Sequence, residues 1–113
     1  MYADVTQTEY DNNSEFFNEL IYASVINALE SSAELVVDTG ATQIYKVDDL
    51  YIQVDYRSDA ILKGVYIYAF SAANRNPRKM GGLWNYNALA LIGVSNARDI
   101  LSTIEAHERA SKS

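Results

Sequence analysis

The chain contains no cysteine, one proline and one histidine. The absence of cysteine excludes disulfide bonds, thiolate metal sites and thiol catalysis, and it fits a reducing compartment. His107 is the single histidine, and the lack of a second one argues against a zinc site or a Ser-His nucleophile. Its position near the end of a predicted helix favours a structural role, because a cation is stabilised there. We therefore expect no metal and no cofactor.

Long apolar runs are also missing, and none approaches the roughly 20 residues that a membrane-spanning helix requires. The first residues, MYADVTQTEYDNN, are acidic and lack the basic and then apolar pattern of a secretory signal. A length of 113 residues and an apolar fraction of 49% predict one globular α+β domain over residues 1–113. We expect a cytoplasmic protein that binds no membrane.

Basic residues are absent before Lys46. Residues 1–62 hold 12 acidic and 2 basic side chains, whereas residues 63–113 hold 3 acidic and 7 basic ones. The net charge of −6 argues against direct nucleic-acid binding, because phosphate contacts need a basic surface. The asymmetry favours a protein partner with a basic surface, although the basic half can also neutralise the acidic half within the molecule. The candidate acidic binding residues are Glu15, Glu19, Glu30, Glu34, Asp48, Asp49 and Asp55.

Helical spacing of apolar residues predicts a helix over about 14–31, lined by Phe17, Leu20, Ile21, Ser24, Val25 and Ala28. Asn12 and Glu15 fit a capping box at its start. Residues 1–11 show no clear period and fit a short strand or an ordered tail. A last helix follows Ser95, which is the expected cap, and its inner stripe is Ala97, Ile100, Leu101 and Ile104.

Between the two predicted helices, apolar residues recur at every second position. Runs rich in Val, Ile and Tyr are separated by short polar turns at 39–40, 48–49 and 58–59, a pattern typical of an antiparallel meander. Residues 88–94 fit a strand or a helical turn, and we favour a fifth strand. The expected fold is α+β, with an N-terminal helix packed on a four- or five-stranded antiparallel meander sheet and a C-terminal helix.

The stretch LVVDTGAT, residues 35–42, joins an apolar run to Asp38, Thr39 and Gly40. It resembles the catalytic motif of the retropepsin-like aspartic proteases. The resemblance implies a homodimer in which each subunit supplies one aspartate, here Asp38, and the two carboxyl groups share a proton. Leu91-Ile92-Gly93 is similar to the turn that this family places before its C-terminal helix. The Asp-Thr-Gly sequence also suits a hairpin turn, with glycine at positive φ.

The stretch NRNPRKMGGLW, residues 74–84, holds three basic residues, the proline, a glycine pair and the one tryptophan. Arg75, Arg78, Lys79 and Trp84 are candidates for a binding loop, because Arg and Trp dominate interaction hot spots. A plain surface loop with Trp84 against the core is the alternative. The glycine spacing does not match a phosphate-binding motif.

These patterns together predict a small acidic, non-catalytic protein-binding module that acts as an inhibitor, adaptor or chaperone-like protein. A sharper version is a phage-type counter-defence inhibitor or a nucleic-acid mimic. The chain has nine tyrosines, and predicted strands carry Tyr51, Tyr56, Tyr66 and Tyr68. These side chains either pack on the sheet or form an interface with another protein, which could be a second copy of the chain in a homodimer. The alternative is a retropepsin-like dimeric protease that uses Asp38.

Overall fold

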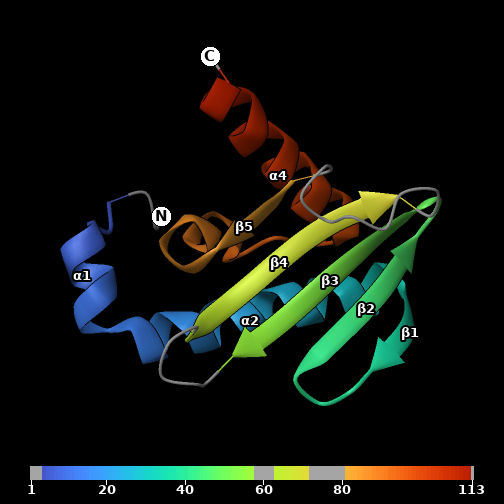
Figure 1. Ribbon diagram of the computed structural model, residues 1–113, viewed down its shortest axis with the longest axis horizontal. Coiled ribbons are helices and arrows are strands. Elements are labelled where there is room, and N and C mark those ends of the chain that lie inside the picture. The colour runs from blue at the N-terminus through green and yellow to red at the C-terminus, as the bar shows by residue number, and fades with distance from the viewer. Residues whose placement is uncertain (1–3, 58–62, 72–80, 113) are drawn as a thin grey trace.

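Five antiparallel strands form one sheet in the order β1-β2-β3-β4-β5, which is also their order along the chain. The computed structural model describes residues 4–57, 63–71 and 81–112 (Figure 1). The meander and both flanking helices confirm the predicted α+β fold. The elements are α1 (Gln7–Asn12), α2 (Ser14–Ser32), β1 (Glu34–Asp38), β2 (Thr42–Val47), β3 (Leu50–Arg57), β4 (Gly64–Ser71), β5 (Gly82–Trp84), the 3₁₀ helix η1 (Asn85–Leu91) and α4 (Ala97–Lys112).

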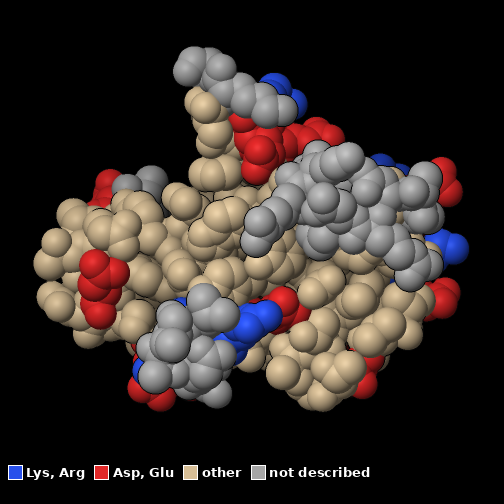
Figure 2. All heavy atoms as spheres, in the orientation of Figure 1, with Lys and Arg blue, Asp and Glu red and all other residues tan. Residues whose placement is uncertain are grey.

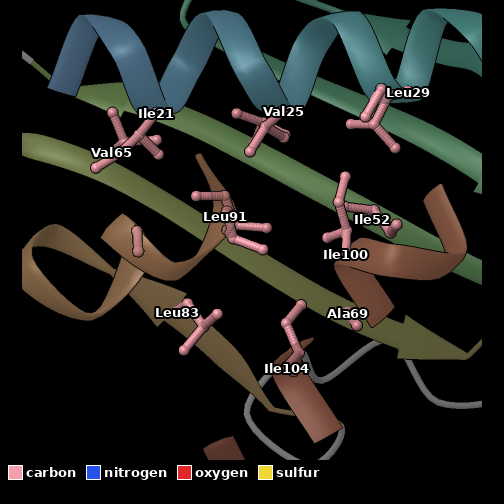
Figure 3. Close-up of a cluster of buried hydrophobic side chains, with 14 of the residues drawn as sticks. Ile21, Val25, Leu29, Ile52, Val65, Ala69, Leu83, Leu91, Ile100 and Ile104 are labelled. Carbon is pink, nitrogen blue, oxygen red and sulfur yellow. The ribbon is translucent and has the colours of Figure 1, made fainter. Parts of the chain in front are cut away.

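The helices pack on one face of the sheet, and α2 passes behind the strands in Figure 1. Ile21, Val25 and Leu29 on α2 are fully buried and point toward the strands, where Ile52 and Val65 meet them (Figure 3). The same core also receives side chains from β5, η1 and α4, namely Leu83, Leu91, Ile100 and Ile104. Alternate strand residues point to the opposite face, here called the open face, over which no described helix passes.

The segment before α2 is helical, so the expectation of a strand or tail over residues 1–11 was wrong for residues 7–11. The Thr6 hydroxyl caps α1 by accepting a hydrogen bond from the Glu9 N–H, and Tyr10 is buried on the core. The predicted capping box of α2 is also wrong, because Asn12 ends α1. Asn13 is the N-cap of α2 and makes no side-chain capping bond, since its amide donates instead to the Glu9 carbonyl.

The fifth strand exists but lies earlier than predicted, over 82–84, whereas 85–91 form η1 and not a strand. Asn85 adopts a positive φ of 53°, which ends the extended conformation directly after Trp84. The buried residues that follow are Ala88, Leu89 and Leu91, and this spacing does not alternate between two faces.

The final helix begins at the predicted position. Ala97, Ile100 and Ile104 are buried, and Leu101 is partly buried. The cap, however, is Asn96 and not Ser95. The Asn96 side-chain oxygen accepts from the Asp99 N–H at 3.0 Å, and the Asp99 carboxylate accepts from the Ser95 N–H at 3.1 Å. Two free N–H groups at this helix start are thereby satisfied reciprocally.

Candidate functional site

Strand β1 lies at the outer edge of the sheet and pairs with β2 alone. It follows α2 directly, because Ala33 caps the helix in an extended conformation and its N–H donates to the Leu29 carbonyl. Three consecutive aliphatic side chains of β1 are exposed, with Leu35 at 47%, Val36 at 41% and Val37 at 39%. We call Glu34, Leu35, Val36, Val37 and Asp38 the edge patch.

The pairing of β1 with β2 contains a β-bulge between Leu35 and Val37. Leu35 is opposite Tyr45 and Val37 is opposite Ile44, so Val36 has no partner on β2. An edge strand also presents backbone N–H and C=O groups that no neighbouring strand satisfies on its outer side. The edge patch therefore combines apolar side chains with open backbone hydrogen-bonding positions.

A carboxylate lies at each end of the edge patch, Glu34 at the start and Asp38 at the end, and both are exposed. The Asp38 carboxylate accepts from the Gly40 N–H at 2.9 Å and from the Gln43 side-chain amide at 3.3 Å. The Gly40 N–H, followed by the Gln43 amide, holds the pKa of Asp38 below its ordinary value. Asp38 is therefore ionised throughout the neutral range.

A hydrogen-bonded chain fixes the turn that carries Asp38. Tyr22 on α2 donates from its hydroxyl to the Gln43 side-chain oxygen at 2.8 Å, and Gln43 donates in turn to Asp38 and to the Gly40 carbonyl. Burial, followed by the charges of Asp38 and Glu30, raises the pKa of Tyr22, so its hydroxyl remains a donor. Helix α2 thus positions the end of the edge strand.

The Asp-Thr-Gly sequence forms the turn between β1 and β2. Gly40 has a φ of +93°, and the Thr39 N–H donates to the Thr42 carbonyl at 2.9 Å. In the chain by itself Asp38 is an exposed carboxylate with a lowered pKa. A proton-sharing pair of aspartates requires instead that one carboxyl group have a raised pKa, which only a second copy could impose.

The predicted acidic residues fall into separate groups. Glu15 and Glu19 border a shallow hollow at the start of α2, together with Lys63 and the 61% exposed Phe16. Glu30, Glu34 and Asp48 border another hollow of about 780 Å³, at the junction of α2, the β2–β3 turn and the start of α4. Asp49 occupies the same β2–β3 turn and is exposed.

The basic half of the sequence partly neutralises these acidic groups. Arg98 donates to the Asp48 carboxylate at 2.6 Å, although both side chains are exposed, so the pair adds little stability. Lys46, which belongs to the acidic half of the sequence, also faces Glu34 across the β1–β2 pairing.

Asp55 lies apart from the other acidic candidates, on the open face, and is only 6% exposed. Its carboxylate accepts from the Thr42 hydroxyl at 2.8 Å and from the Gln53 amide at 3.1 Å. These hydrogen bonds compensate for the burial of the carboxylate. Asp55 therefore presents little of its charge to a partner.

Trp84 lies on β5 at the open face and is 44% exposed, whereas its neighbour Leu83 enters the core. Arg75, Arg78 and Lys79 lie outside the described residues.

Sequence reasoning missed the surroundings of Trp84. Tyr66, Tyr68, Gly81, Gly82, Trp84 and Glu108 line one hollow of about 470 Å³, here called the aromatic pocket. The signals for it were the alternation of Tyr66 and Tyr68 and the glycine pair before Trp84.

His107 is half-buried on α4. Among residues 4–57, 63–71 and 81–112, no three His, Cys, Asp or Glu side chains come together in a way that could hold a metal ion. Within that same part of the chain, every helix is too short or too polar to cross a membrane.

No family model matches this chain, and comparisons with curated proteins and with solved structures find no match either. Functional proposals therefore depend on the geometry and chemistry of the described residues.

Proposed function

We propose that this chain is a small non-catalytic protein-binding module that acts by protein–protein contact through the edge patch. One observation carries the proposal, which is the exposure of Leu35, Val36 and Val37 side by side on an unpaired sheet edge. Edge strands are usually shielded against pairing by short length, charged residues, proline, a β-bulge or a covering element. Strand β1 has five residues and one bulge but no lysine or proline, and its three exposed aliphatic side chains suit the addition of a strand from another protein.

The two carboxylates define the chemistry of the partner. A strand added beside β1 would place its two ends near Glu34 and Asp38. A basic residue at each end of that strand would be electrostatically complementary to these carboxylates. Its centre would present aliphatic side chains to Leu35, Val36 and Val37. The partner is therefore an extended segment with an apolar centre and Lys or Arg at its ends, which accords with the acidic character of the first half of the chain.

A second copy of the chain fits this edge poorly. In an antiparallel pairing centred on Val36, Glu34 of one copy would lie beside Asp38 of the other at both ends. Two carboxylates would then lie side by side at each end, although Lys46 on β2 lies opposite Glu34, and directly opposed like charges destabilise a strand pair. The edge patch thus disfavours its own dimer while it favours a basic partner.

The experiment is the selection of binders from a library of displayed random peptides on the intact chain. We expect the enriched peptides to have aliphatic centres and basic ends. Replacing Leu35, Val36 and Val37 together by threonine keeps strand propensity and charge but removes apolar surface, and should weaken peptide binding about tenfold or more, measured by fluorescence anisotropy.

Phe16→Gln is the matched control, because it removes the most exposed large apolar side chain elsewhere on the described surface and should leave the affinity unchanged. Glu34→Gln should weaken binding of basic-ended peptides by a smaller factor. Enrichment of acidic peptides, or equal affinity for the threonine variant and the unaltered chain, would reject the proposal.

A further inference from the structure

The aromatic pocket lies on the open face where β4 meets β5, away from the edge patch at the other side of the sheet. The register of these two strands places Tyr66 opposite Trp84 and Tyr68 opposite Gly82. The rings of Tyr68 and Trp84 have their centroids 6.2 Å apart. The described part of this face is mostly uncharged, and its acidic side chains lie mainly toward the rim (Figure 2).

Two glycines allow the close packing at the wall of the pocket, where a larger residue would clash. A Cβ atom on Gly82 would lie 2.6 Å from the Ile67 carbonyl oxygen and 3.0 Å from the Tyr68 ring. A Cβ atom on Gly81, whose φ is +106°, would lie 2.7 Å from the side chain of Glu108. The close approach of Glu108 to Gly81 brings a carboxylate from α4 to the wall of the pocket.

Among the residues that the structure describes, three aromatic rings and one carboxylate line the pocket, and these groups favour positive charge. The faces of aromatic rings carry negative potential and attract cations, and they also pack well against methyl and methylene groups. The chain already uses this attraction once, because the Arg57 guanidinium carbon lies over the Tyr66 ring, 6.0 Å from its centroid. An anion would be repelled by Glu108, and a neutral ligand would desolvate that carboxylate without compensation.

We propose that the aromatic pocket binds an alkylammonium cation, with its methyl or methylene groups against Trp84 and Tyr68 and its charge beside Glu108. Such a cation is available as a free quaternary ammonium compound or as a methylated lysine side chain on a protein. The proposal is independent of strand addition at β1, since it uses other residues on another part of the sheet.

The fluorescence of Trp84 offers a direct test, because the chain contains no other tryptophan. The intact chain is titrated with tetramethylammonium and with choline, at an ionic strength held constant with NaCl. We expect a saturable change with a dissociation constant of about 1 mM. The neutral analogue 3,3-dimethyl-1-butanol, which has the shape of choline without its charge, should produce no saturable change.

A variant pair assigns the charge selectivity to Glu108. Glu108→Gln should weaken choline binding about tenfold, as expected for the loss of one close opposite charge. Glu105→Gln, on the same helix and exposed, removes an equal charge and should leave the affinity unchanged. Peptides that carry trimethyl-lysine or unmodified lysine distinguish the two sources. A peptide that binds more tightly than choline identifies a protein side chain, and equal or weaker binding identifies a free cation.

Three results would overturn the assignment. These are an equal response to choline and to its neutral analogue, no saturable response to any cation, and unchanged choline affinity in Glu108→Gln. The comparison of choline with its neutral analogue uses the unaltered chain. It therefore tests the selectivity of the pocket for a cation even where a variant fails to fold.

Discussion

At the scale of single residues, Asp38 shows how one side chain both closes a turn and sets a charge. Its carboxylate accepts from the Gly40 N–H and from the Gln43 amide, and both hydrogen bonds favour the ionised form. The folded chain therefore keeps Asp38 charged at a pH where an ordinary aspartate begins to be protonated. That behaviour suits a permanent negative end for the edge patch.

We predict that the Asp38 carboxyl group titrates below the ordinary aspartate pKa of 3.8, as measured by NMR of its side-chain carbon. Because folding lowers this pKa, the stabilisation that it gives is present above pH 3.8 and is lost as the pH falls through the folded value. Asp38→Asn should therefore reduce the free energy of unfolding at neutral pH and remove that part of the acid dependence, measured by urea unfolding. A pKa above 3.8 would instead favour a proton-sharing pair of the retropepsin type.

The residue scale also marks the limit of sequence reasoning. The Asp-Thr-Gly turn was predictable as a hairpin, because glycine tolerates the positive φ that the turn needs. Asn85 carried no comparable signal, and its positive φ of 53° is what ends β5 and starts η1. The close fit of the Asn85 side chain against Gly64, where a Cβ would lie 1.7 Å from the amide oxygen, arises from tertiary packing and has no periodic trace in the sequence.

At the scale of elements, β1 differs from the other strands because all five of its residues are exposed. The alternating pattern of β3 made that strand predictable, since one side of it enters the core. Helix α2 was predictable for the same reason at a period of 3.6. Strand β4 was predictable from a run that is apolar throughout, although only one of its faces packs against the helices. The edge position of β1, by contrast, follows from the order of strands in the whole sheet, so no signal in the sequence indicated that its aliphatic side chains are exposed.

The charges of β1 predict a gain of self-association from one substitution. Glu34→Lys would place a lysine of one copy beside Asp38 of another in an antiparallel pairing centred on Val36, which makes the edge complementary to itself. We expect the unaltered chain to be a monomer at about 10 μM and the Glu34→Lys variant to dimerise, by size-exclusion with light scattering. Glu30→Lys, an equal charge change on the neighbouring helix, is the control and should stay monomeric. A dimer of the unaltered chain would contradict this account of the edge.

At the scale of the whole molecule, the uneven charge of the sequence is only partly preserved in space. Glu15 and Glu19 lie near Lys63, and Asp48 pairs with Arg98, so both acidic groups meet cations from the other half of the chain. DNA carries a charge about every 1.7 Å along its axis, and a surface interrupted in this way imitates that spacing poorly. We therefore place the contact with a basic partner at the edge patch, where Glu34 and Asp38 flank an apolar centre.

Amide hydrogen exchange of the whole chain, with and without a saturating peptide selected on it, tests this placement most directly. Strand addition should slow exchange at β1, residues 34–38, where open backbone N–H groups gain partners. Exchange in α2 near Glu15 and Glu19 should remain unchanged. Protection over the start of α2, with β1 exchanging as in the free chain, would contradict the edge patch as the binding surface and would favour the nucleic-acid mimic instead.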